Sequence, residues 1–125
     1  MNILITGCTG FIGFHLSQSL LKDNINVVGI DNLNDYYDVN LKKKRVKQLF
    51  KSNRFKFYKI DIKEKLKIEK IFKHNKIDFI FHFAAQAGVR HSIDHPRKYV
   101  ESNILGFYNL LENVKNYKVK RLFYA

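Results

Sequence analysis

The feature that most constrains this chain is a short apolar strand that runs directly into three evenly spaced glycines. The segment 2–6 reads NILIT, and Gly7, Gly10 and Gly13 follow it. The first glycine of such a series permits a tight turn, the second lets a pyrophosphate approach the backbone, and the third lets the next helix pack close to the strand. The N-terminus of that helix presents free N–H groups and a positive dipole end to an anion. The spacing predicts a dinucleotide-binding turn, although glycines are also common in turns without a ligand.

A second apolar strand supports this interpretation because it ends in an acid. The segment 26–31 reads NVVGID, which places Asp31 about 20 residues beyond the glycine turn. A carboxylate at this point accepts hydrogen bonds from the 2′- and 3′-hydroxyls of an adenosine ribose and repels a 2′-phosphate. The pattern therefore favours NAD over NADP, with an ordinary turn acid as the alternative.

The composition indicates one domain over residues 1–125. Apolar residues make up 46% of the chain, and a single proline with six glycines leaves no stretch typical of a flexible linker. The net charge is +12, and the densest basic run, 42–47, lies among apolar residues at helical spacing: Leu41, Val46, Leu49 and Phe50. We interpret the run as the solvated face of a helix and, without a stacking platform, we expect no nucleic-acid partner.

Cysteine content and hydropathy indicate the cellular compartment in which the chain is expected. Cys8 is the only cysteine, so no disulfide can form within the chain. No apolar run reaches membrane-spanning length, and the first strand is not preceded by a basic leader. We expect a cytoplasmic protein without a membrane partner.

Short apolar strands alternate with amphipathic segments, which is the pattern of a parallel sheet with crossover helices. We predict strands at 2–6, 26–31, 54–60, 77–83 and 119–125, and helices at 11–22, 38–51, 63–74 and 96–116. The expected fold is α/β, a Rossmann-type doubly wound parallel sheet of strand order 3-2-1-4-5. Phenylalanines alternate with basic residues in the third strand, which favours an edge position for it.

Candidate ligand residues follow the ends of these strands, at one edge of the sheet. Asp61 and Ile62 close the third strand and could flank an adenine, while Asp61 could equally cap the next helix. Ala84, Ala85 and Gly88 are small residues where the fourth strand opens, so they permit backbone to approach a ribose or simply form a loop.

These segments together resemble the extended short-chain dehydrogenase/reductase family of nucleotide-sugar epimerases and dehydratases. The resemblance spans the chain and rests on Thr6–Gly13, Asp31–Leu33, Asp61–Ile62, His82–Arg90 and Asn103–Gly106. Within the family, Asp31–Lys42 and Gln86–Arg90 look like the UDP-glucuronate 4-epimerase branch.

The resemblance implies a role for each matching position. The implied NAD contacts are Gly7, Gly10, Phe11, Ile12 and Gly13 at the pyrophosphate, Asp31 and Asn32 on the adenosine side, Asp61 and Ile62 at the adenine, and Phe83, Ala84 and Ala85 at the nicotinamide ribose, with Asn103 positioning the adjacent loop. Gln86 and Arg90 would face the sugar nucleotide, Arg90 being suited to a carboxylate or phosphate. His82 lies inside a strand and is expected to be structural, whereas His91 stands where we expect a tyrosine. We expect no metal site.

The chemistry implied by the resemblance is transient oxidation of the sugar at C4 by NAD, assisted by a tyrosine with a neighbouring lysine. None of the seven tyrosines is followed four residues later by a lysine. We therefore expect an N-terminal portion whose sheet is incomplete after the fifth strand, with no catalytic residue among the 125, no turnover alone and a homodimer in the complete protein. Apolar residues around the last strand favour this interpretation: Phe107, Leu111, Leu122 and Phe123. The alternatives are a non-catalytic dinucleotide-binding or interaction module and a sugar-nucleotide dehydratase.

Overall fold

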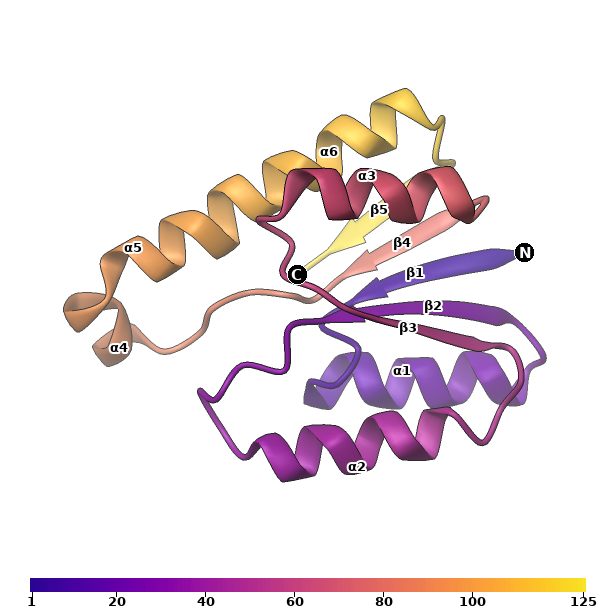
Figure 1. The fold of residues 1–125 in the computed structure, drawn as a ribbon, viewed down its shortest axis with the longest axis horizontal. Coiled ribbons are helices and arrows are strands. Elements are labelled where there is room, and N and C mark those ends of the chain that lie inside the picture. Colours follow the sequence, from indigo (N-terminus) through magenta and orange to yellow (C-terminus); the bar gives the residue numbers. More distant parts are fainter.

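A parallel sheet forms the centre of the computed structural model, which describes residues 1–125 (Figure 1). The strands are β1 (Asn2–Thr6), β2 (Asn26–Asp31), β3 (Phe55–Lys59), β4 (Phe79–His82) and β5 (Arg121–Tyr124). Their order is β3-β2-β1-β4-β5, which confirms the prediction. All neighbours pair in parallel, so the carboxyl ends of the strands meet at one edge. Thr6 pairs with Ile30 on one side and His82 on the other, which brings the candidate ligand segments together.

Helices cover both faces of the sheet. α1 (Phe11–Lys22) and α2 (Val39–Leu49) lie on one face, and α3 (Lys65–His74) and α6 (Phe107–Asn116) lie on the other (Figure 1). The predicted helices 38–51 and 63–74 begin slightly later than expected, because Asp38 and Glu64 occupy their N-cap positions. No helix is both long and apolar enough to span a membrane.

The segment between β4 and α6 differs from the prediction. In place of one helix over 96–116, the chain forms α5 (Pro96–Tyr99), a π-helical segment η1 (Val100–Gly106) and then α6. A further short helix, α4 (Val89–Asp94), occupies part of the segment predicted as a loop. α4 and α5 are separate because a residue before proline avoids the helical region, and His95 accordingly has φ −132° and ψ 54°.

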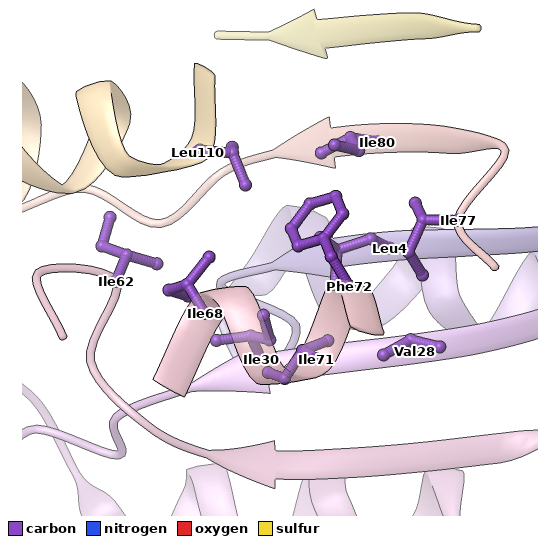
Figure 2. Close-up of a cluster of buried hydrophobic side chains, with 10 residues drawn as sticks. All are labelled: Leu4, Val28, Ile30, Ile62, Ile68, Ile71, Phe72, Ile77, Ile80 and Leu110. Atoms are coloured by element: carbon purple, nitrogen blue, oxygen red, sulfur yellow. The ribbon is translucent and has the colours of Figure 1, made fainter. Parts of the chain in front are cut away.

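Two apolar clusters hold the helices to the sheet. Successive side chains of a strand point to opposite faces, so Leu4 belongs to one cluster and Ile5 to the other. The larger cluster lies beneath α3 and α6, where Phe72 and Leu110 pack toward the strands (Figure 2). The smaller cluster includes Phe14 of α1. Each fully buried side chain of this kind contributes about 1.5–3 kcal/mol to folding.

The buried face of α2 differs from the predicted one. Leu41 and Phe50, expected on its apolar face, are 40% and 55% exposed. Lys42, expected in the solvated basic run, is only 4% exposed and shares the buried stripe with Val46 and Leu49. Positions 42, 46 and 49 follow the i, i+4, i+7 spacing of one helix face, so Lys42 faces the interior.

The edges of the sheet are β3 and β5, which confirms the edge position predicted for the third strand. Beside β5, Leu111 and Phe123 are exposed as expected. Leu122 instead packs against the larger apolar cluster, and Phe107 is half-buried. The apolar surface around β5 is therefore smaller than the sequence predicts.

Candidate functional site

Glycines build the turn between β1 and α1. Gly7 has φ +69°, a left-handed conformation that favours glycine, and a Cβ there would lie 2.8 Å from the Ala84 amide nitrogen. A Cβ at Gly13 would lie 2.2 Å from the Gly7 carbonyl oxygen. Gly10 has an ordinary φ of −66°, and a Cβ there would meet that oxygen at 3.2 Å. The fold itself requires Gly7 and Gly13, whereas it tolerates a small side chain at Gly10.

The N-terminus of α1 opens from this turn. Gly10 is its N-cap and supplies no side-chain acceptor to the first turn of the helix. The side chains of Phe11 and Ile12 are exposed, so their backbone amides are the groups that they can offer to an anion. No acidic residue lies in this first turn to compete with an anion for the positive end of the dipole.

Asp31 ends β2 with its carboxylate held by backbone amides. The Thr9 N–H donates to Oδ2 at 3.1 Å, and the Leu33 N–H donates to Oδ1 at 2.9 Å. The residue is only 8% exposed. Because each carboxylate oxygen can accept more than one hydrogen bond, both retain lone pairs for a further donor. The bond from Thr9 ties the position of this carboxylate to the glycine turn.

A cavity of about 180 Å³ lies at this carboxyl edge of the sheet. Ten of the predicted ligand residues line it: Gly7, Gly10, Asp31, Asn32, Asp61, Ile62, Phe83, Ala84, Ala85 and Gln86. The other predicted residues, Phe11, Ile12, Gly13, Arg90 and Asn103, do not line it. The fold thus brings the ends of four strands to one concave surface, as expected for a sheet with a topological switch point between β1 and β4.

Residues around α2 that the sequence analysis did not identify complete this site. Lys42 and Tyr37 line the cavity. Arg45 donates from Nη1 to the Thr9 carbonyl oxygen at 2.8 Å, and the Tyr37 hydroxyl donates to the same oxygen at 3.3 Å. Side chains of α2 and of the segment that precedes it therefore hold the glycine turn in place. Helical spacing was the available signal for Lys42, whereas nothing in the basic run distinguishes Arg45.

The Lys42 ammonium is part of the cavity wall. Nζ donates to the Asn34 backbone oxygen at 2.9 Å and to its Oδ1 at 2.7 Å, and lies 4.2 Å from the centre of the Tyr37 ring. Burial lowers the pKa of Lys42 from its ordinary value, while the nearby Asp31 acts in the opposite direction. An ammonium has three N–H donors, so one remains for a ligand beside Asp31.

Asp61 does not cap α3, because Glu64 is the N-cap of that helix, but it holds the turn before the helix and faces the cavity. Its Oδ1 accepts from the Lys63 N–H at 3.0 Å, and its own N–H donates to Glu64 Oε2 at 2.9 Å. Its Oδ2 accepts from Asn32 Nδ2 at 3.0 Å, which joins the ends of β2 and β3. The helix cap expected as the alternative at Asp61 is therefore wrong, whereas its position at the cavity is as predicted.

A buried hydrogen-bonded group supports the loop that follows β4. Thr6 Oγ1 lies 2.6 Å from His82 Nδ1, and the Ala84 amide donates to the same Oγ1 at 3.2 Å. The His82 ring stacks on Phe107, with 5.1 Å between ring centres. Burial lowers the pKa of His82 to about 4. The imidazole is therefore neutral at pH 7, and the structural role predicted for His82 is confirmed.

Asn103 holds the backbone of Gln86 from the η1 segment. The Gln86 N–H donates to Asn103 Oδ1 at 2.8 Å, and Asn103 Nδ2 donates to the Gln86 carbonyl oxygen at 3.0 Å. Two opposed hydrogen bonds therefore fix the end of the 83–86 loop. The predicted contact between Asn103 and this loop is present, although Asn103 itself does not line the cavity.

A second, more polar cavity of about 540 Å³ adjoins the first and shares Asn34, Tyr36 and Gln86 with it. His91 lines this second cavity. Arg90, its neighbour on α4, is exposed and lines neither cavity. Of the two residues predicted to face a sugar nucleotide, the structure brings only Gln86 to these cavities.

Comparison with known proteins agrees with this geometry. The family model described as GDP-mannose 4,6 dehydratase matches residues 4–125. A UDP-glucuronate 4-epimerase of Thermodesulfobacterium geofontis is 49% identical over 122 residues, which is 98% of this chain and 38% of that protein. Protein CapI of Staphylococcus aureus is 45% identical over 125 residues, which is 100% of this chain and 37% of CapI. The chain therefore spans less than half the length of the curated relatives that it matches.

Solved structures share the same fold. The UDP-glucuronic acid 4-epimerase of Bacillus cereus, in complex with UDP-glucuronic acid and NAD, has a TM-score of 0.90 and 37% identity over 99% of this chain and 39% of that one. The UDP-glucose 4-epimerase of Thermotoga maritima with UDP-glucose has a TM-score of 0.84 and 33% identity over 99% of this chain and 37% of that one. The family model matches nearly the whole chain, and the chain shares its Rossmann fold with these epimerases. The chain therefore belongs to the GDP-mannose 4,6 dehydratase family, within the short-chain dehydrogenase/reductase proteins that the sequence motifs predict.

Proposed function

We propose that this chain is the NAD-binding part of a nucleotide-sugar 4-epimerase whose substrate is UDP-glucuronate or a similar sugar nucleotide. The observation that carries the proposal is the cavity in which the Asp31 carboxylate is tied to the glycine turn by the Thr9 amide. That arrangement pairs a backbone phosphate site with an acceptor for ribose hydroxyls. The NAD bound in the Bacillus cereus epimerase supports the choice of cofactor.

The residues of this site fit the adenosine diphosphate half of NAD, from its pyrophosphate to its adenine. Gly10 leaves the space that a Cβ would fill, and the first amides of α1 are available to the pyrophosphate. The free lone pairs of Asp31 and the remaining N–H of Lys42 suit the two ribose hydroxyls. Asn32, Asp61 and Ile62 would then surround the adenine.

The other half of the cofactor would follow the loop after β4. Phe83, Ala84 and Ala85 line the cavity, and the two alanines are small enough for a ribose to approach the backbone. The chemistry that NAD supplies in such an enzyme is the removal and return of a hydride at a sugar carbon. This chain contributes binding and orientation: Thr6 and Asn103 hold the loop at Ala84 and Gln86. Gln86, which lines both cavities, is our candidate for contact with the sugar nucleotide. The contact of Arg90 with the sugar nucleotide stays a prediction from the sequence.

A second candidate function is dehydration of a sugar nucleotide, which the description of the matching family model favours. The relatives described as UDP-glucuronate 4-epimerases favour epimerisation. Analysing the product that a complete protein forms from UDP-glucuronate distinguishes them, because epimerisation conserves mass whereas dehydration loses one water. The proposal includes a homodimer for the whole protein and, because Cys8 is buried and unpaired, a reducing cytoplasmic location.

The glycine turn offers a matched pair of variants. Gly10→Val is expected to leave the fold intact but to weaken NAD binding by at least about 100-fold, since its side chain occupies the pyrophosphate position. Gly13→Val is expected to lose the fold, because its Cβ would lie 2.2 Å from the Gly7 carbonyl oxygen. Circular dichroism and calorimetric titration with NAD measure the two effects separately. A folded Gly10→Val chain with unchanged affinity for NAD would contradict the phosphate-site assignment.

The chain alone is expected to show no epimerase turnover with UDP-glucuronate and NAD. A general acid–base pair contributes about 10²–10⁴-fold, and no tyrosine here has the lysine partner implied by the family resemblance. Chromatography of the reaction products measures turnover, with the same chain tested for NAD binding as a control. Epimerisation by the purified 125-residue chain would overturn the assignment of roles and direct attention to His91 or Tyr36 as a base.

A further inference from the structure

The short helix α4 lies beyond the carboxyl edge of the sheet (Figure 1), and it carries His91 within it and His95 as its C-cap. His91 and His95 are one helical turn apart, and the His95 N–H donates to the His91 carbonyl oxygen at 2.9 Å. Their ring centres are 4.5 Å apart. The histidine rings that form hydrogen bonds in this protein are those of His82 and His74. The nitrogens of the α4 pair are therefore available to a ligand.

The pair is held in place by its surroundings. Pro96 restricts the backbone of His95, which has φ −132° and ψ 54°. The half-buried His91 ring packs beside Tyr36 and Tyr99, with 5.2 and 6.1 Å between ring centres. His95 is exposed, so solvent and ions reach the pair. The contacts around His91 therefore reduce the side-chain freedom that this ring loses when a ligand binds.

We propose that His91 and His95 together bind a divalent ion of the late first-row transition metals. A metal–nitrogen distance of about 2.0–2.1 Å places the ion about 3.2 Å from each imidazole centre. Two rings that share one ion therefore have their centres at most about 6.4 Å apart. The observed separation of 4.5 Å lies within this limit. Among these ions, imidazole ligands bind Cu²⁺ most tightly, followed by Ni²⁺.

Water completes the coordination in this proposal, because no group of three or more His, Cys, Asp or Glu side chains could hold an ion together. The site is therefore open on one side, and its affinity rests on the two imidazoles. It is independent of the proposed NAD function, since neither histidine is assigned to the cofactor.

Calorimetric titration of the 125-residue chain with CuCl₂ tests the proposal. We expect one site that His91→Gln or His95→Gln weakens by at least about tenfold. His15→Gln and His74→Gln are the matched controls, because each removes an exposed histidine outside the pair, and both should leave the affinity unchanged. Ni²⁺ should bind less tightly than Cu²⁺, and the four variants should rank in the same order of affinity for it.

Electron paramagnetic resonance of the Cu²⁺-loaded chain gives a readout that does not depend on substitution. We expect nitrogen splitting from two equivalent imidazoles. Circular dichroism shows that each variant is folded before it is titrated. Wild-type affinity in His95→Gln, an equal loss in all four variants, or a spectrum with one imidazole nitrogen would each overturn the proposal.

Discussion

Replacing Asp31 by alanine is expected to weaken NAD binding by at least about 100-fold and to remove most of the preference for NAD over NADP. Each of the two ribose hydroxyls donates a hydrogen bond to a charged acceptor in our proposal, and such a bond contributes about 1.5–3 kcal/mol. The carboxylate also repels a 2′-phosphate, so its removal penalises NAD far more than NADP. Calorimetric titration of the wild-type chain and Asp31→Ala with both cofactors measures the two affinities.

Asp78 provides the matched control for this experiment. Its carboxylate also accepts from a backbone amide, that of Asn2 at 3.0 Å, but it precedes β4 and therefore lies at the opposite edge of the sheet. Asp78→Ala is expected to lower stability without changing the affinity for NAD. Equal affinities of the wild-type chain for NAD and NADP, or tighter binding of NADP, would exclude the role proposed for Asp31.

Protonation of His82 is expected to destabilise the folded chain by about 3 kcal/mol between neutral pH and pH 4. Burial lowers the pKa of His82 to about 4 in the folded chain, from an ordinary value of 6.5. Between these pH values the unfolded chain binds a proton that the folded chain does not. The free energy of unfolding therefore falls as the pH drops through this window, and the full contribution of the neutral ring is present above pH 6.5.

Urea denaturation at several pH values measures this contribution. His82→Asn keeps an amide near the Thr6 hydroxyl but cannot take up the proton, so its free energy of unfolding should fall less between pH 7 and pH 4 than that of the wild type. His15→Asn replaces an exposed histidine and should retain the wild-type slope. Parallel pH profiles for the wild type and His82→Asn would show that His82 is not held neutral by the fold.

The sequence alone determined the strand order and most of the glycine turn, because these depend on local patterns. Strands of apolar residues separated by amphipathic helices leave few arrangements other than a doubly wound sheet. The positive φ of Gly7 and the close contact at Gly13 follow directly from a tight turn between a strand and a helix. Asp31 was predictable for the same reason, because β2 pairs with β1 and its last residue therefore lies beside the glycine turn.

Only the tertiary structure decided the rest of the site. Arg45 acts on the backbone of Thr9, 36 residues away, so no local pattern marks it, and the family resemblance alone implied the contact of Asn103 with the loop at Gln86. Lys42 faces inward because burial of Val46 and Leu49 sets the rotation of α2 against the sheet. The four-residue spacing of His91 and His95 is visible in the sequence, but the 4.5 Å between their ring centres is a property of the folded chain. Local patterns specify elements, whereas the positions of side chains within the cavity depend on how those elements pack.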